Sequence, residues 1–192
     1  MKRLLSLKWR LLPLVLALGV LLAPIAINYW NKHRVTVAAE SADQKLETSE
    51  PVRISGTPNR ILVPELSIDL PVVSQSYSTV LKTWPVAAGE ANYATESAPA
   101  NNIKGESLIY GHNNRNVFGP LLKLKTGDTV YVYTANGHIF KYSYLGSRDV
   151  TPEKTGIIKS LATAGPGLKM LTCDGPNFEF RHLMSFKLLK AS

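Results

Sequence analysis

Residues 11–31 form a stretch of 21 positions that holds no charged side chain. At a rise of about 1.5 Å per residue, a helix of this length reaches about 31 Å, which matches the hydrocarbon thickness of a bilayer. Four basic residues precede the stretch and only two follow it: Lys2, Arg3, Lys8 and Arg10, then Lys32 and Arg34. Because positive charge stays on the cytoplasmic side, the sequence predicts a single transmembrane anchor at 11–31. The basic N-terminus at 1–10 is expected in the cytoplasm, and the rest of the chain on the other side of the cell membrane.

A cleaved signal peptide is the alternative interpretation of this segment. Signal peptides have an apolar region of about 7 to 15 residues that ends in small residues at a cleavage site. Here the apolar run is longer and leads into Asn28-Tyr29-Trp30-Asn31-Lys32, whose aromatic rings suit a membrane interface. The sequence therefore favours an anchor that is not removed.

The net charge of +8 belongs mostly to this N-terminal region. Residues 1–34 contain six Lys or Arg and no acidic residue, which leaves a net charge of +2 for residues 35–192. No basic run or stripe occurs in that second part, so nucleic-acid binding is not expected.

Two regions follow the predicted anchor. Residues 32–58 are predicted to be an extracytoplasmic stalk, because from Val35 onward they are rich in Ala, Ser, Thr and Glu and contain no aromatic residue. Residues 59–192 are more hydrophobic and, at about 134 residues, have the usual size of one domain with one core.

The domain at 59–192 is predicted to be mainly β. Short apolar runs bounded by Pro, Gly or polar residues are typical of strands, and such runs occur at 60–64, 68–73, 107–110, 129–134, 138–145, 169–173 and 178–188. Pro64 and Pro71 make the first two runs compatible with edge strands. Asn136-Gly137, flanked by β-branched and aromatic residues, indicates a hairpin.

The number of short strands favours a closed architecture. With about eight strands, closure into a barrel or a sandwich is the economical way to cover the sheet edges. On the second arm of the hairpin, Phe140, Tyr142 and Tyr144 are expected to share one face. Residues 118–124 and 153–162 are expected to form short helices between strands.

The only cysteine of the chain, Cys173, ends a predicted strand and is followed by the loop residues Asp174-Gly175-Pro176. A lone cysteine in an exported domain is an inert buried thiol, an intermolecular partner or a nucleophile. Thiols of ordinary pKa, about 8.5, are mostly protonated at neutral pH, so a nucleophilic cysteine needs a nearby imidazole or cation.

Four histidines could supply the imidazole. Three of them are less suited to a catalytic role. His33 flanks the predicted anchor, and His138 lies next to a predicted hairpin turn. His182 is the chain neighbour of Arg181 on a predicted strand, so the two side chains are expected on opposite faces. His112 follows a predicted strand and leads into a polar loop, which is also the arrangement of the cysteine. From spacing alone, a catalytic and a solvated His112 remain equally open.

The order of several short motifs resembles the sortase family, the membrane-anchored cysteine transpeptidases of bacterial cell surfaces. These motifs are IYGHNN, FGPLLKLKTGD, RDVTP, LTCDG and FEFRH. The similarity extends from about Arg60 to Leu188, and the order of Gly-His, Thr-Cys and Arg is more specific than any single motif. The resemblance implies a closed eight-stranded sortase-type β-barrel at 59–192 with one or two short helices, preceded by the transmembrane helix.

The resemblance also implies an activity. Cys173 would attack the carbonyl between Thr and Gly in a Leu-Pro-x-Thr-Gly type sorting signal and form a thioester with the substrate protein. His112 would protonate the leaving amine and deprotonate the incoming amine. Arg181 would donate hydrogen bonds to the substrate backbone or to the oxyanion. Thr172 could line the same groove or merely fill a strand position.

Two departures from the family pattern bear on specificity. Lys169 stands where the family often has the first Thr of Thr-Leu-x-Thr-Cys, so that threonine is missing here. Tyr110-Gly111-His112 replaces the frequent Ala-Gly-His and resembles the class that accepts Leu-Ala-x-Thr-Gly. The Tyr110 phenol would bind a substrate backbone group that proline does not offer.

The partners implied are surface proteins with a C-terminal sorting signal and an amine acceptor, expected to be a cell-wall precursor peptide. No cofactor is implied. The acidic residues Glu65, Asp69 and Glu106 lack ligand spacing, so no metal site is assigned. The enzyme is expected in the cell membrane, with a single span at 11–31 and an extracytoplasmic catalytic domain.

Two other classes of protein compete with this interpretation. A membrane-tethered β domain that binds a peptide or glycan without chemistry would explain the anchor, the stalk and the strands, but not the order of the motifs. A papain-like hydrolase would need a helix N-terminus behind the cysteine, whereas the run before Cys173 is predicted to be a strand.

Overall fold

The computed structural model describes residues 52–80, 83–152 and 157–192. The predicted cytoplasmic N-terminus, the predicted anchor and most of the predicted stalk lie outside these ranges. Among the described residues, no helix has the length and apolar character needed to cross a bilayer. The elements below all belong to one unit of the chain, Arg53–Ser192.

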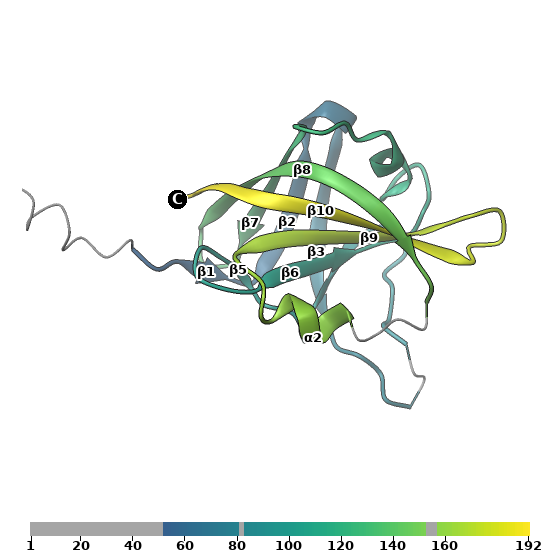
Figure 1. The fold of residues 1–192 in the computed structure, drawn as a ribbon, viewed down its shortest axis with the longest axis horizontal. Coiled ribbons are helices and arrows are strands. Elements are labelled where there is room, and N and C mark those ends of the chain that lie inside the picture. Colours follow the sequence, from purple (N-terminus) through teal and green to yellow (C-terminus); the bar gives the residue numbers. More distant parts are fainter. Residues whose placement is uncertain (1–51, 81–82, 153–156) are drawn as a thin grey trace, which may run out of the picture. The chain divides into compact units, whose positions relative to one another are not determined.

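Eight strands form a closed barrel (Figure 1). In the order of their pairing, they are β10 (Phe180–Ala191), β8 (Ile139–Val150), β7 (Thr129–Thr134), β2 (Pro58–Val63), β3 (Ile68–Gln75), β4 (Ala91–Ala94), β6 (Glu106–Tyr110) and β9 (Gly167–Asp174). β9 pairs again with β10, which closes the barrel. The pairs β3–β4 and β6–β9 are parallel, whereas the other pairs are antiparallel. The predicted closed eight-stranded barrel is therefore confirmed.

Smaller elements lie between these strands. They are β1 (Ser55–Gly56), which pairs with β5 (Ala100–Asn101), the 3-10 helices η1 (Pro64–Leu66) and η2 (Gly119–Lys123), and the short α-helix α2 (Ile157–Leu161). The strand β1 falls within the range predicted as a stalk. The segments 118–124 and 153–162, expected as short helices, contain η2 and α2.

The hairpin predicted at Asn136-Gly137 joins β7 and β8, with Gly137 at a φ of 87° that suits glycine. As expected from the period of a strand, Phe140, Tyr142 and Tyr144 all belong to the main hydrophobic core.

The expectation of edge strands at the N-terminal end of the domain is wrong. β2 pairs with β3 on one side and with β7 on the other. β3 pairs with β2 through Ile68–Pro71 and with β4 through Val72–Gln75. Pro71, which lacks an N–H, lies where the pairing changes partner, which explains how a closed barrel tolerates it.

A second apolar cluster lies on the outer wall of the barrel. On β9, Leu168 and Met170 belong to the main core, whereas Leu171 packs against this second cluster, because successive residues of a strand point to opposite faces. The cluster also contains side chains from β4, β6, α2 and the β3–β4 connection: Ala94, Leu108, Tyr110, Leu161, Ile158 and Trp84. These contacts hold α2 beside β6 and β9, where Figure 1 shows it.

Candidate active site

A groove of about 190 Å³ lies over the outer face of the barrel. Its floor is formed by residues of β6, β9 and β10, and its walls by the β3–β4 connection, α2 and the end of β8. All five site residues predicted from the sequence line this groove: Tyr110, His112, Thr172, Cys173 and Arg181.

Cys173 and Arg181 are brought together by the antiparallel pair of β9 and β10. They are Cα partners in this pair, and residues directly opposite each other on antiparallel strands project their side chains to the same face. Cys173 is half-buried and lines the groove. The Nη1 atom of Arg181 donates to the main-chain carbonyls of Phe178 at 2.8 Å and Phe180 at 3.0 Å, which holds the guanidinium beside the β9–β10 connection.

His112 reaches the same end of the groove through the parallel pair of β6 and β9. Tyr110 lies opposite Leu171 in this pair, so His112 and Cys173 each follow two residues beyond the same paired position. Because parallel strands run in the same direction, both residues leave their strands at the same end of the barrel. The imidazole of His112 is exposed to solvent.

Main-chain hydrogen bonds fix the backbone on both sides of His112. The Gly111 N–H donates to the Leu171 carbonyl at 3.1 Å, and the carbonyl of His112 accepts from the N–H of Phe118 at 3.1 Å. A Cβ atom on Gly111 would lie 2.9 Å from Cγ1 of Val117. A glycine therefore permits the close approach of this turn to the chain that follows it.

Thr172 is buried, with 2% of its surface exposed. Its hydroxyl donates to the carbonyl of Gly111 at 3.0 Å. This bond links the residue before Cys173 to the residue before His112. The threonine is thus suited to hold the two strand ends in register.

Tyr110 is buried, and its hydroxyl donates to the main-chain carbonyl of Pro85 at 2.7 Å. Its ring also contacts Trp84, with ring centroids 6.5 Å apart. Burial raises the pKa of Tyr110 above its usual value, and the Glu96 carboxylate adds to this effect. The phenol therefore stays protonated and ties the wall formed by Trp84-Pro85-Val86 to the floor of the groove.

Glu96 supports the same wall from outside the groove. Its carboxylate accepts hydrogen bonds from the backbone N–H of Tyr77 at 2.7 Å and from Nε1 of Trp84 at 3.1 Å. Burial alone would raise the pKa of Glu96, but these two bonds, together with a bond from its own backbone N–H, outweigh burial and lower the pKa. This wall was not predicted from the sequence, in which no strand or helix was expected between the apolar runs at 68–73 and 107–110.

Behind the groove, three further polar side chains meet, of which only His182 was considered from the sequence. Its Nδ1 lies 2.9 Å from Oδ1 of Asp149 and 3.5 Å from Oδ2 of Asp174. In the part of the chain that the structure describes, these three residues are the group with ligand atoms close enough to hold a metal ion, all within 4.8 Å of one another. His182 does not line the groove that contains Arg181, in agreement with the expected opposite faces.

A family model and several solved structures each match most of the chain. Residues 61–184 match the Sortase domain family. The fold is similar to sortase A from Listeria monocytogenes, with 23% identity, a TM-score of 0.57, and coverage of 71% of this chain and 90% of that chain. It is also similar to sortase E1 from Streptomyces coelicolor, solved with a tripeptide in its active site, with 18% identity, a TM-score of 0.58 and the same coverage. Sortase C-1 from Actinomyces oris is 24% identical, with a TM-score of 0.55 and coverage of 68% of this chain and 71% of that chain. Among curated proteins, no match was found.

Proposed function

The chain belongs to the sortase family of cysteine transpeptidases, and we propose that it cleaves a sorting signal of the Leu-Pro-x-Thr-Gly or Leu-Ala-x-Thr-Gly type between Thr and Gly and transfers the protein to an amine. The observation that carries this proposal is the arrangement of three neighbouring strands. β6, β9 and β10 place His112, Cys173 and Arg181 at one end of one groove.

The reaction has two halves, and Cys173 and His112 act in both. In the first, Sγ of Cys173 attacks the carbonyl carbon of the substrate threonine as the thiol proton passes to His112. The bond to the glycine nitrogen then breaks as His112 gives that proton to the nitrogen. The product is a thioester between the substrate and the enzyme. In the second, an amine attacks the thioester carbonyl and the carbon–sulfur bond breaks. The amine's proton passes to His112 and from there to the departing Sγ, which restores the thiol.

Arg181 stabilises the negative oxygen that develops in each half. Its two described hydrogen bonds, to Phe178 and Phe180, both use Nη1. A guanidinium has five N–H donors in a fixed plane, so Nε and Nη2 can still donate to the substrate carbonyl. The bonds through Nη1 hold the group in place before the substrate arrives, which is the condition for effective electrostatic stabilisation.

The other surfaces of the groove suit an extended peptide with an apolar side chain. Leu108, Leu171 and Leu183 line the floor, and Val86 and Ile158 line the walls. Since the Tyr110 hydroxyl already donates to Pro85, we assign Tyr110 an indirect part in specificity. It sets the position of the Trp84–Val86 wall, against which the second residue of the sorting signal would pack.

The location of the enzyme and its partners is part of the same proposal. Residues 11–31 would anchor the chain in the cell membrane with residues 1–10 in the cytoplasm. The part of the predicted stalk that precedes β1 would extend the catalytic domain toward the cell wall. The substrates would be surface proteins with a C-terminal sorting signal. The amine would come from a cell-wall precursor peptide.

The test uses the full-length chain in detergent with matched Leu-Pro-x-Thr-Gly and Leu-Ala-x-Thr-Gly peptides and a glycine-based amine. We expect mass spectrometry to show cleavage after Thr, a thioester mass on the enzyme, and a product joined to the amine. Cys173→Ala should abolish all three. Folded wild-type protein that forms neither adduct nor product with either peptide would favour the non-catalytic binding domain instead.

A further inference from the structure

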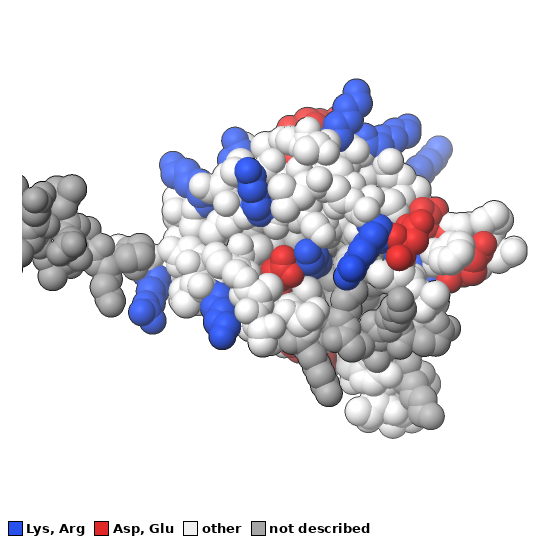
Figure 2. Space-filling view, viewed as in Figure 1, with Lys and Arg blue, Asp and Glu red and all other residues white. Residues whose placement is uncertain are grey.

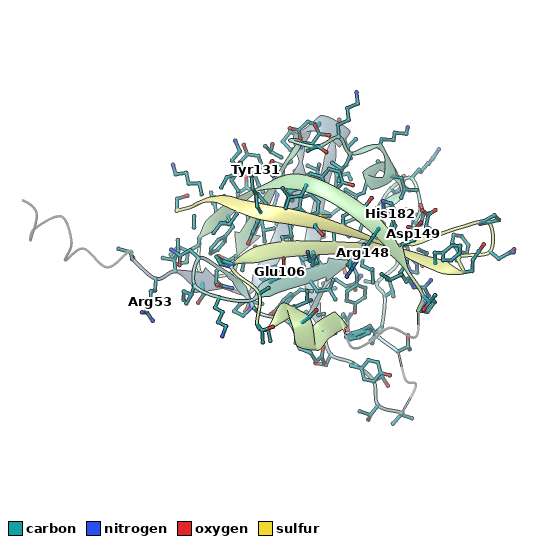
Figure 3. The ribbon with its side chains drawn as sticks, in the orientation of Figure 1. Arg53, Glu106, Tyr131, Arg148, Asp149 and His182 are labelled. Atoms are coloured by element: carbon teal, nitrogen blue, oxygen red, sulfur yellow. The ribbon has the colours of Figure 1, made fainter. Side chains whose placement is uncertain are left out.

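We propose that His182, together with Asp149 and Asp174, forms a clip behind the groove that positions Cys173 and Arg181 for the reaction. This inference rests on the proposed function and adds a positioning role for residues that do not touch the substrate. Figure 3 shows His182 on β10 and Asp149 on β8 close together, at the base of the hairpin that joins β9 and β10. In Figure 2, acidic side chains gather at the base of that hairpin.

The clip and the groove use alternate residues of the same three strands. On each strand, one residue lines the groove and its chain neighbour belongs to the clip: Val150 and Asp149 on β8, Cys173 and Asp174 on β9, and Arg181 and His182 on β10. Successive side chains of a strand point to opposite faces. A restraint on the clip residue therefore fixes the rotation of the strand at the groove residue beside it.

The contacts of His182 reach both neighbouring strands. Asp149 is its Cα partner on β8, and Thr172 is its partner on β9, two residues before Asp174. A carboxylate accepts hydrogen bonds only, so Nδ1 of His182 carries the hydrogen that it donates to Asp149 over 2.9 Å. Asp174 lies 3.5 Å from the same Nδ1 through Oδ2 and accepts from the N–H of Gly175 through Oδ1 at 2.8 Å.

These side-chain contacts lie where the main-chain pairing stops. The β8–β10 pairing ends at Val150 and Arg181, and the β9–β10 pairing ends at Asp174 and Phe180. Strand ends open locally more easily than strand centres, and the groove residues lie in these last pairs or in the pair next to them. A displacement of about 1 Å at a reacting group costs on the order of 100-fold in rate, so a link across all three strand ends bears directly on the reaction.

The test compares His182→Ala with a control that removes a similar link elsewhere between the same strands. Ser185 on β10 accepts a hydrogen bond from Nζ of Lys169 on β9 at 2.9 Å, and neither residue lines the groove. Ser185→Ala therefore removes a cross-strand bond away from the site. His182→Asn keeps a side-chain N–H near the place of Nδ1 and serves as the rescue variant.

We expect His182→Ala to lower kcat about tenfold or more in the full-length chain, with KM within about twofold of wild type. Ser185→Ala should leave kcat within about twofold, and His182→Asn should recover most of the loss. All assays contain a chelator, because the clip residues could also bind a cation. A His182→Ala enzyme with wild-type kcat, or an equal loss of kcat in Ser185→Ala, would refute the positioning role.

Hydrogen exchange separates this inference from the proposed function. In His182→Ala, the backbone amides at 174–181 should exchange faster than in wild type, whereas Ser185→Ala should leave them unchanged. This measurement needs no substrate. An inactive wild type with the expected exchange pattern would refute the proposed reaction but support the clip. Unchanged exchange in His182→Ala would refute the clip even if the enzyme is active.

Discussion

Removal of the Tyr110 hydroxyl should destabilise the protein, whereas removal of the Tyr142 hydroxyl should not. Both rings are buried. The hydroxyl of Tyr110 donates to the Pro85 carbonyl at 2.7 Å, but the hydroxyl of Tyr142 has no hydrogen-bond partner among the described residues. Phenylalanine keeps the ring in each case, so the two substitutions differ in whether a bond is lost.

The expected magnitudes follow from these partners. A buried hydrogen bond contributes about 0.5–1.5 kcal/mol, and an acceptor left without its donor adds to the loss. Tyr110→Phe should therefore lower the free energy of unfolding by about 1–2 kcal/mol, or the melting temperature by about 3–6 °C for a domain of this size. An unpaired buried hydroxyl costs about 1–3 kcal/mol. Tyr142→Phe should hence leave the stability unchanged or raise it.

Urea unfolding of both variants and the wild type measures this difference, and peptide assays show its effect on the groove. With its tie to Pro85 removed, the Trp84–Val86 wall should move more freely in Tyr110→Phe. The preference between Leu-Ala-x-Thr-Gly and Leu-Pro-x-Thr-Gly peptides should then become smaller. A Tyr110→Phe protein as stable as wild type, or a larger loss in Tyr142→Phe, would show that the described hydrogen bonds do not govern these positions.

Three further outcomes are expected. Thr172→Val should lose the bond to the Gly111 carbonyl, which should lower both kcat and, by about 1–3 kcal/mol, the free energy of unfolding. Thr172→Ser keeps the hydroxyl and should retain most of the stability and most of kcat. Urea unfolding and the peptide assay measure these two quantities. Arg181→Lys should lower kcat about 100-fold or more in the peptide assay, while the rate at which an alkylating reagent labels Cys173 should stay near that of wild type. Burial raises the pKa of three tyrosines above the ordinary value of 10.0, Tyr93, Tyr110 and Tyr142. The folded protein then keeps protons that the unfolded chain releases, so the stability should fall as pH rises above about 10, and less steeply in Tyr142→Phe, as followed by urea unfolding at several pH values.

The barrel strands that were predicted from the sequence share a local signal, and β4, the barrel strand that was not predicted, lacks one. β-branched and aromatic residues dominate β7, and Asn-Gly marks its turn into β8. β4 reads Ala-Asn-Tyr-Ala, and alanine and asparagine are poor strand formers. All four of its residues are buried, since it lies between β3 and β6. Its place in the barrel is therefore set by its neighbours rather than by its own composition.

The groove residues also divide into those that had a local signal in the sequence and those that did not. The positions of His112 and Cys173 at the ends of strands were visible in the sequence, because Cys173 ends one apolar run and His112 follows another after Gly111. The contact of Tyr110 with Pro85 joins residues 25 positions apart, and that of His182 with Asp149 joins residues 33 positions apart. Such contacts depend on strand register, which local sequence patterns do not determine. For this reason neither the bond between Tyr110 and Pro85 nor the clip was predicted.

The parallel pairing of β6 with β9 also determines when a reactive site can exist during folding. β9 lies between β6 and β10, so the site needs strands that are far apart in the chain, and the bond between Thr172 and Gly111 alone spans 61 positions. Contacts of such long range form slowly, because a large loop must close first. Before β9 has paired with β6 and β10, the chain carries a thiol that does not lie beside His112 or Arg181. Reactivity would then arise only once the last strand has closed the barrel.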